Sequence, residues 1–390
     1  NALEDASSGL QSSRRATPPL MCTSLQYTDS KGATYFGRTL ELDVDEPWVL
    51  AYVPVGMDFV SDAPDLEPFK YTSKYGFLGV TAPARMPTKE EPLTQNDLKV
   101  CEGMNTEGVT FSLLAYPTSG APGEAVANTV EAIQAWDLGT FILSQCSTVA
   151  DAKEQLAKEH VYLTRIALVG NAVFPFHLVV HDKTGAAIVI EWLDGEIEVY
   201  DNPVGVMTNG PTFPWHLTNL GNWTHLTNVD QSSAKFGSLD VHQPDSGIAT
   251  ASLPGSNTSV GRFIRATFYA NFAEKVSDPD KAMLTLSRIM DNFDRPRGAT
   301  TNPSTEGGEG MKFQGIGGND SAPPTEYTVW TNMADLNRGK FFFRSYSAFN
   351  WTSFDLEALS EANEPRAMLA SQLDTMGGDG TQALLAGMAV

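Results

Sequence analysis

The sequence has little positive charge and no long apolar run. Lys and Arg number 26 against 47 Asp and Glu, which gives a formal net charge of −21, and no basic block is longer than two residues. Binding to nucleic acid depends on clustered basic side chains that displace counterions from phosphates, and anionic membrane surfaces attract the same side chains. The apolar runs stop well short of the ~20 residues that span a bilayer. We therefore expect neither a nucleic-acid partner nor a membrane partner.

Several common catalytic motifs are also absent. The chain has no Gly-x-Ser-x-Gly elbow, no phosphate-binding P-loop and no His-Glu-x-x-His zinc motif. His177 and His181 share one face of a predicted strand, and we interpret them as core or rim residues instead of metal ligands. Three cysteines, Cys22, Cys101 and Cys146, are too few for a disulfide scaffold or a four-cysteine zinc site. We expect no metal and no cofactor, and the odd number leaves at least one thiol unpaired.

What is present is a chain of 390 residues, 42% of them hydrophobic, which is ample for one large core. No linker divides it, so we predict a single domain over residues 22–390. Residues 1–21 differ, because Ser, Ala and Pro alternate with charged residues and the apolar region of a signal peptide is missing. We interpret them as a polar leader that is removed. A remnant of this kind, left after a secretory signal, favours the periplasm or the exterior; the cytoplasm is the alternative.

Hydrophobic periodicity predicts blocks of strands and helices. Cys22–Tyr27 and Thr34–Thr39 flank a polar stretch with glycine and predict a hairpin. The other main expected strands are Trp48–Val53, Tyr71–Tyr75, Phe77–Thr81, Val109–Ala115, Val173–His181, Ala186–Trp192, Tyr327–Asn332 and Lys340–Tyr346. Helical spacing is expected over Val126–Cys146, with a break at Asp137–Gly139. Further helices are expected over Thr148–Glu159, which begins with a Thr N-cap pattern, and over Val260–Lys275 and Pro279–Asp294, with a C-terminal helical tail over Leu356–Met376. Turn-linked strands without strict βαβ alternation predict an α+β fold in which two antiparallel sheets carry helices outside.

Cys22 opens the first expected strand directly after the disposable segment. Arg38 and Glu41 follow 16 and 19 residues later on the second strand of the hairpin. Across a hairpin this spacing returns Arg38 beside Cys22, where a guanidinium would stabilise the thiolate and lower a thiol pKa that starts near ~8.5. On spacing alone, a buried structural cysteine explains the pattern as well.

Several short stretches, in the same order along the chain, carry a family resemblance. They are Cys22–Ser24, Phe36–Glu41, Thr72–Gly76, Glu102–Gly108, Ile142–Cys146, Met207–Leu220, Gly261–Phe263, Asp294–Gly298 and Thr325–Val329. Through them the sequence, from Cys22 to about Asn350, resembles the choloylglycine hydrolase and penicillin V acylase family of N-terminal-nucleophile hydrolases. The resemblance implies a four-layer αββα sandwich and an amidase that cleaves linear C–N bonds.

The resemblance also implies a role for five residues. Cys22 matches the nucleophile, and its own α-amine, once the leader is removed, matches the general base. Arg38 matches the arginine beside the thiol. Glu41 falls where the family typically has Asp, which holds the α-amine and polar groups of the substrate, so its side chain is one methylene longer. Asn209 matches the amide that donates to the oxyanion, and Arg262 matches the last catalytic arginine.

A second oxyanion position falls on Ala115. Bile salt hydrolases typically have Asn there and many penicillin acylases have Tyr, so only the backbone N–H of Ala115 can serve. The candidate substrate-binding residues are apolar or aromatic, as suits an acyl group: Leu40, Met57, Phe59, Leu138 and Phe141. Core packing explains Leu138 and Phe141 equally well.

The function expected from the resemblance is hydrolysis of a small acyl amide, of the penicillin V acylase type. N-acyl homoserine lactones are a further substrate class. The enzymatic alternative is a bile salt hydrolase, which the departure at Ala115 disfavours. A non-catalytic ligand-binding relative, kept inert by its leader, is the alternative from another class. Because members of the family are often tetramers, a homo-oligomer is expected.

Overall fold

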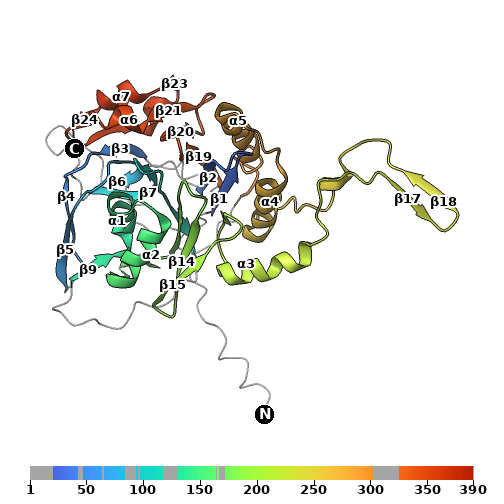
Figure 1. Cartoon of the computed structure of the whole chain (residues 1–390), viewed down its shortest axis with the longest axis horizontal. Helices are drawn as coiled ribbons and strands as arrows, with labels where there is room; N and C mark the ends of the chain where they lie inside the picture. The colour runs from blue at the N-terminus through green and yellow to red at the C-terminus, as the bar shows by residue number, and fades with distance from the viewer. Residues whose placement is uncertain are drawn as a thin grey trace, which may run out of the picture.

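The computed structural model describes residues 21–42, 47–63, 66–83, 94, 97–116, 131–163, 165–166, 172–301 and 325–389. In this part of the chain two large sheets are stacked face to face (Figure 1). The first sheet has seven strands, in the order β16 (Val206–Met207), β1 (Met21–Thr28), β2 (Thr34–Leu42), β19 (Tyr327–Asp335), β20 (Lys340–Ser345), β21 (Thr352–Asp355) and β23 (Gly378–Asp379). All neighbours in it are antiparallel except β21 and β23.

The second sheet has nine strands and is antiparallel throughout the described part. Its order is β15 (Glu196–Asp201), β14 (Ala187–Leu193), β13 (Phe176–His181), β8 (Thr110–Ala115), β7 (Leu98–Asn105), β6 (Phe77–Pro83), β3 (Val49–Val53), β22 (Arg366–Leu369) and β24 (Met388–Ala389). Short strands outside the two sheets are β4 (Asp58–Ser61), β5 (Glu67–Thr72), β9 (Glu131–Gln134), β10 (His160–Tyr162), β11 (Arg165–Ile166), β12 (Ala172–Val173), β17 (Ser233–Phe236) and β18 (Leu239–His242).

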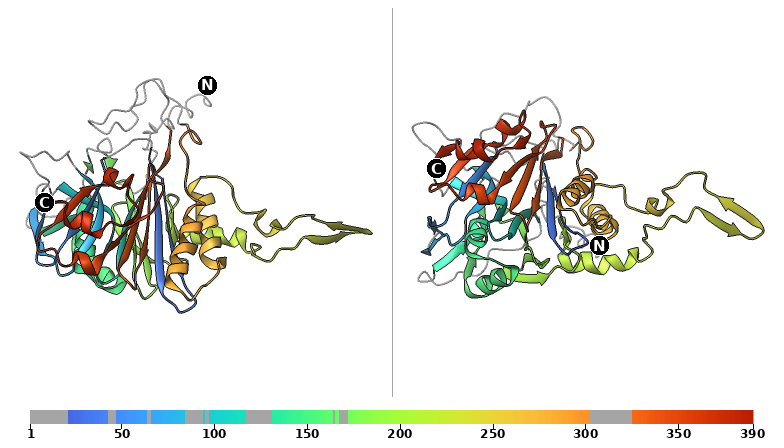
Figure 2. Two further views of the ribbon diagram at one scale, coloured as in Figure 1. Left: turned by 90° about the horizontal axis from the view of Figure 1, so that it is seen from above. Right: turned by 45° about the horizontal axis from the view of Figure 1, so that its top comes forward.

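Helices cover the outer faces of both sheets (Figures 1 and 2). Helices α4 (Ser259–Phe272) and α5 (Pro279–Met290) pack on the first sheet, and α1 (Leu138–Gln145) and α2 (Val149–Lys158) pack on the second. One core cluster joins the two sheets and α4 and α5, and a second lies between the second sheet and α1 and α2. The expected α+β sandwich is confirmed. The remaining α-helices of the described residues are α3 (Phe213–Asn219), α6 (Leu356–Leu359) and α7 (Thr381–Leu385). No helix in the described part is long and apolar enough to cross a membrane.

Local sequence patterns correctly predicted the first hairpin and the start of helix α2. The expected hairpin is formed by β1 and β2, paired from Met21 opposite Glu41 to Thr28 opposite Thr34. Helix α2 begins after Thr148, whose side chain accepts a hydrogen bond from the backbone nitrogen of Asp151 at 3.0 Å, as expected from the N-cap pattern.

Two helix predictions are wrong in part. Within the expected helix Val126–Cys146, residues 126–130 lie outside the described residues, Glu131–Gln134 forms strand β9, and α1 begins at Leu138 where a break was expected. The expected C-terminal helix contains only the single-turn α6, after which β22 pairs with β3. The physical reason is non-local, because the exposed edge of β3 offers backbone donors and acceptors that a helix cannot satisfy.

Strands β1 and β2 lie in the interior of the sandwich. All nine residues of β2 are buried, including the charged Arg38 and Glu41. Buried charges are costly unless they are paired and hydrogen-bonded. Their presence on a central strand therefore directs attention to this part of the fold.

The hairpin β17–β18 extends away from the body of the molecule (Figures 1 and 2). It exposes 69% of Phe236, 63% of Leu239 and 42% of Val241. A two-stranded hairpin alone in water is marginally stable at best, and clustered exposed apolar side chains are typical of an interaction surface. The homo-oligomer expected from the resemblance stays a prediction, and this hairpin is where it can be tested.

We expect the double variant Phe236→Ser, Leu239→Ser to form smaller species than the unmodified protein at micromolar concentration, because these two exposed side chains would supply the apolar contact between copies. Light scattering coupled to size exclusion would measure the mass. Val55→Ser, which removes an exposed valine from the body of the molecule, is the control and should keep the mass of the unmodified protein. A monomeric unmodified protein, or an unchanged mass in the double variant, would contradict the prediction.

Candidate active site

Cys22 and Arg38 lie side by side on the paired strands β1 and β2. Cys22 is paired with Leu40 across β1 and β2, and Arg38 is two residues further along the same face of β2. The Nη2 atom of Arg38 donates a hydrogen bond to the sulfur of Cys22 at 3.2 Å. Only 1% of Cys22 is exposed. The spacing of 16 residues thus brings the guanidinium to the thiol, as the hairpin predicted.

The guanidinium of Arg38 is held by groups of the second sheet. Its Nη1 atom donates to the carbonyl of Cys101 at 3.0 Å and lies 3.4 Å from Oε2 of Glu102. Its Nη2 atom also donates to the carbonyl of Leu113 at 2.6 Å. The carbon of the guanidinium lies 4.8 Å from the centre of the Trp330 ring. Arg38 therefore crosses from one sheet to the other and is fixed at both ends.

The protonation of Cys22 differs from the sequence-based expectation. Burial raises the pKa of the Cys22 thiol, while Arg38 and a hydrogen bond from the Ala115 backbone act to lower it. Arg38 thus acts in the expected direction, but desolvation outweighs it and the expected net lowering is wrong. A thiol that holds its proton near neutral pH needs a base to become a nucleophile.

Asn209 and Arg262 hold the backbone of Cys22. The nitrogen of Cys22 donates to Oδ1 of Asn209 at 3.0 Å, and the Cys22 carbonyl accepts from Nη1 of Arg262. Arg262 also donates from Nη2 to Oδ1 of Asn209 at 2.6 Å. The Nδ2 atom of Asn209 donates to the carbonyl of Ala115 at 2.7 Å. The structure therefore brings Asn209, Arg262 and Ala115 together at Cys22.

Neighbouring elements fix both side chains. Asn209 follows β16, and its backbone nitrogen donates to Oγ of Ser259 at 3.0 Å, while Nε2 of His216 lies 2.9 Å from its carbonyl oxygen. Arg262 lies in the first turn of α4, and its Nε atom donates to the carbonyl of Asn257 at 3.0 Å. Asn209 and Arg262 are therefore positioned by the start of α4 as well as by each other.

Glu41 lies on the opposite face of β2 from Arg38. It is fully buried, and Thr328 donates from Oγ1 to Glu41 Oε1 at 3.3 Å. Burial raises the pKa of Glu41, and the positive charges of Arg262 and Arg295 lower it. Glu41 therefore interacts electrostatically with Arg262, and the guanidinium of Arg262 is hydrogen-bonded to the Cys22 carbonyl.

Three charged residues of the site were not singled out from the sequence. Glu102 contacts Arg38, and Arg295 forms a buried ion pair with Glu326 at 2.6 Å. Burial raises the pKa of Glu102 to about 7 and that of Glu326 to about 7. Glu102, Arg295 and Glu326 all lie inside stretches that carry the family resemblance, so position in those stretches was the available signal.

The candidate substrate-binding residues lie in different layers. Leu40 belongs with Cys22 to the core cluster that joins the sheets. The others belong to or pack against the cluster behind the second sheet: Met57, Phe59, Leu138 and Phe141. There the ring of Tyr71 lies 5.3 Å from that of Phe59 and 5.3 Å from that of Phe141. The structure places only Leu40 beside Cys22, and a substrate-binding role for all five stays a prediction.

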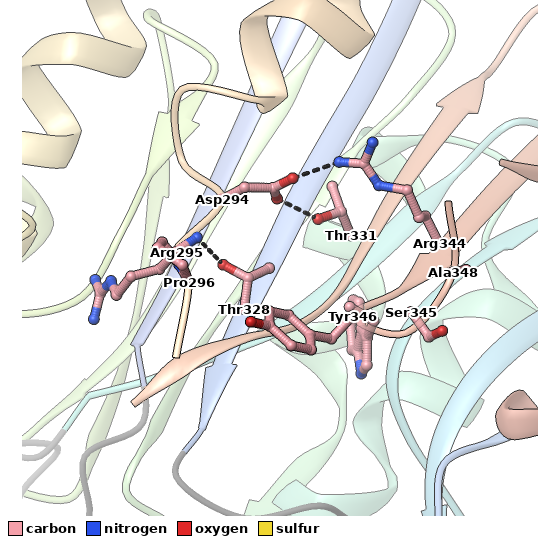
Figure 3. A pocket seen from close by; sticks show the side chains of 10 residues that line it. Asp294, Arg295, Pro296, Thr328, Thr331, Arg344, Ser345, Tyr346 and Ala348 are labelled. Carbon is pink, nitrogen blue, oxygen red and sulfur yellow. Dashed lines mark hydrogen bonds and ion pairs between the residues drawn. The ribbon is translucent and has the colours of Figure 1, made fainter. Parts of the chain in front are cut away.

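A cavity of about 250 Å³ adjoins the site. Its walls come from the segment after α5 and from β19 and β20 (Figure 3). Thr328, which bonds to Glu41, and Trp330, which lies against Arg38, both line it. The Asp294 carboxylate binds Thr331 and Arg344, while the guanidinium of Arg295 points away from these residues (Figure 3).

Known proteins share this sequence pattern and this fold. The family model for linear amide C–N hydrolases, the choloylglycine hydrolase family, matches residues 22–367. A bile salt hydrolase/transferase from Clostridium perfringens is 24% identical over 86% of this chain and 92% of its own length. A penicillin V acylase from Pectobacterium atrosepticum is 26% identical over 91% of this chain and 85% of its own length.

Two solved structures are similar in fold. A cysteine-to-alanine variant of conjugated bile acid hydrolase from Clostridium perfringens has a TM-score of 0.71 and 21% identity, covering 89% of this chain and 96% of that one. Penicillin V acylase from Agrobacterium tumefaciens has a TM-score of 0.70 and 22% identity, covering 93% of this chain and 96% of that one.

We expect Arg38→Ala to raise the pH midpoint for iodoacetamide labelling of Cys22 by about one unit or more, because the nearest positive charge is lost. Peptide-resolved mass spectrometry would separate Cys22 from the other thiols. Arg38→Lys should restore part of the shift, since it keeps the charge but not the planar fork. The control is Arg338→Lys, at an arginine paired with Asp335 instead. A midpoint in Arg38→Ala equal to that of the unmodified protein would remove Arg38 from the chemistry.

Proposed function

The chain belongs to the choloylglycine hydrolase family of linear amide C–N hydrolases, and on that premise we propose that it hydrolyses acyl amides with the thiol of Cys22 as nucleophile and the α-amine of Cys22 as base. One observation carries the proposal. Both reactive groups of this residue have a dedicated partner, because Arg38 binds the sulfur and Asn209 binds the nitrogen. The start of the family match at Cys22 supports the same residue.

The proposed reaction begins with a proton transfer within Cys22. A free α-amine has a reference pKa of roughly 7.7–8, close to neutral, whereas a peptide nitrogen is not basic. The amine takes the thiol proton and the sulfur attacks the carbonyl carbon of the substrate. The C–N bond then breaks, the α-ammonium returns the proton to the leaving amine, and an acyl group remains on sulfur. Attack by water on this thioester releases the acid and regenerates the thiol.

The oxyanion of the tetrahedral intermediate needs hydrogen-bond donors near the sulfur. One is the Ala115 backbone, which is directed at the Cys22 sulfur. The other is Nδ2 of Asn209, which uses one hydrogen on the Ala115 carbonyl and retains a second. Arg262 binds the Cys22 carbonyl and Asn209 together and so holds the nucleophile and the donor at a fixed separation.

For the substrate we propose a penicillin V acylase type of amide, with N-acyl homoserine lactones as a further class. The absence of a side-chain donor at Ala115 supports this choice over conjugated bile acids, and a penicillin V acylase is among the relatives. Bile salt hydrolases are also among the relatives, so bile salt hydrolysis is the second candidate.

We expect the active protein to begin at Cys22, because the mechanism needs a free α-amine beside the thiol. Intact mass and N-terminal sequencing of active material would measure this. Cys22→Ala should retain residues 1–21 if cleavage is autocatalytic, and clean removal in that variant would indicate a separate protease. Full activity in protein that still begins at Asn1 would exclude the mechanism.

Two variants test the proposed oxyanion donors, and the second of them also tests the substrate class. Asn209→Ala should lower kcat by roughly 10²–10³ with a smaller effect on KM, because the lost donor acts mainly in the transition state. Ala115→Asn adds a donor and should raise activity on conjugated bile acids more than on penicillin V. The measurement is kcat/KM for taurocholate, penicillin V and a long-chain acyl homoserine lactone. A tenfold preference of the unmodified protein for taurocholate would replace the penicillin acylase assignment with bile salt hydrolysis.

A further inference from the structure

Glu102 is a buried carboxylate that touches the site without touching the nucleophile. It lies on β7 with no exposed surface, and its Oε2 atom is 3.4 Å from Nη1 of Arg38. Ser112 on β8 donates to the same oxygen at 2.6 Å, and Asn332 on β19 donates to Oε1 at 3.3 Å. Both oxygens are therefore fixed by donors from three strands besides its own.

Arg38 has two neighbours that can carry the negative charge opposite its single positive charge. Nη1 faces the Glu102 carboxylate, and Nη2 faces the Cys22 sulfur. A buried guanidinium requires about one compensating negative charge. If Glu102 provides it, the thiol can remain neutral; if Glu102 is neutral, the Cys22 thiolate is the remaining counter-ion on Arg38.

We propose that Glu102 is a positioning residue that acts as the counter-ion of Arg38, holds the guanidinium against Cys22 and keeps the nucleophile in its thiol form until the α-amine accepts the proton. The proposal rests on the proposed function of Cys22 and adds a residue that sets its protonation. Burial raises the pKa of Glu102 to about 7, so in the alkaline range where thiols titrate the carboxylate is ionised and opposes a nearby thiolate.

Other ionisable groups lie near Cys22 and Glu102. The groups whose charge acts on Cys22 or Glu102 are Arg38, Glu41, Arg262 and Cys101. Burial raises the pKa of Cys101 to about 12, so this thiol is neutral through the working range. Glu41 lies on the other face of β2, where Arg262 and Arg295 act on it. Glu102 is therefore the acid in direct contact with the guanidinium that binds the nucleophile.

The test is the pH midpoint for iodoacetamide labelling of Cys22 in processed protein. Glu102→Gln keeps the shape and an acceptor but removes the charge, so the midpoint should fall by about one pH unit as the thiolate becomes the counter-ion of Arg38. The pH profile of kcat/KM should move in the same direction. Glu102→Asp keeps the charge and should return the midpoint most of the way to the original value.

Two further variants keep the proposal testable if Glu102→Gln folds poorly. Ser112→Ala removes the 2.6 Å bond that stabilises the carboxylate, so Glu102 is protonated more easily and the midpoint should fall by a smaller amount. Asp335→Asn is the matched control, because Asp335 is a fully buried acid on β19 that pairs with Arg338 and not with Arg38. Its thermal unfolding temperature should fall, with the labelling midpoint unchanged.

A purely structural role would lower the unfolding temperature of the Glu102 variants and leave the midpoint in place. Midpoints within 0.2 pH unit of the original in both Glu102→Gln and Ser112→Ala, or a rise in either, would overturn the proposal. Because labelling reports on the thiol without turnover, it separates this outcome from failure of the proposed function. If the unmodified protein hydrolyses none of these amides, the proposed function is refuted. The labelling midpoints still decide whether Glu102 is the counter-ion of Arg38.

Discussion

The site depends on the hydrogen bonds that the guanidinium of Arg38 makes to both sheets. Arg38 belongs to β2 of the first sheet, yet most of its hydrogen bonds go to β7 and β8 of the second sheet. An arginine buried without partners would destabilise the sandwich by several kcal/mol. The two sheets can therefore close around this residue only in the register that supplies the Cys101 and Leu113 carbonyls and the Glu102 carboxylate. The same register brings the Cys22 sulfur to Nη2 of Arg38, so the packing of the two sheets and the position of this sulfur have one cause.

The two faces of β1 and β2 carry different residues of the site. The inner face carries the Cys22 sulfur and Arg38, where burial and charge set the protonation of the thiol. The outer face carries Glu41, and there α4 supplies Arg262 to the backbone of Cys22. Because alternate side chains of a strand point to opposite faces, the sulfur and the carboxylate of Glu41 are kept apart by the sheet itself. The backbone nitrogen of Cys22 lies between these two environments and is bound by Asn209.

Sequence reasoning located the parts of the site that depend on local spacing. The turn after Thr28 fixes the register of the hairpin, and this register alone brings Arg38 to Cys22. Asn209 and Arg262 came only through the family resemblance, because they reach Cys22 from 187 and 240 residues away. Glu102 lay inside a matching stretch, but its role depends on contact between the sheets, which no periodicity encodes. The helix predicted for the C-terminal tail was wrong for a similar reason. The apolar spacing of Leu356–Met376 suits a helix, but pairing with the edge of β3 favours the strand β22.

In the proposed mechanism, the contact between Cys22 and Asn209 exists before residues 1–21 are removed and can persist afterwards. In the full chain the nitrogen of Cys22 is a peptide N–H that donates to Oδ1 of Asn209 at 3.0 Å. A free amine keeps N–H groups that can make the same bond and gains a lone pair, which the peptide nitrogen delocalises into its carbonyl. In the proposed mechanism cleavage therefore adds a base without requiring a new contact at this position. Arg262 donates to Oδ1 of Asn209 at 2.6 Å and so holds this acceptor in place for either form of the Cys22 nitrogen.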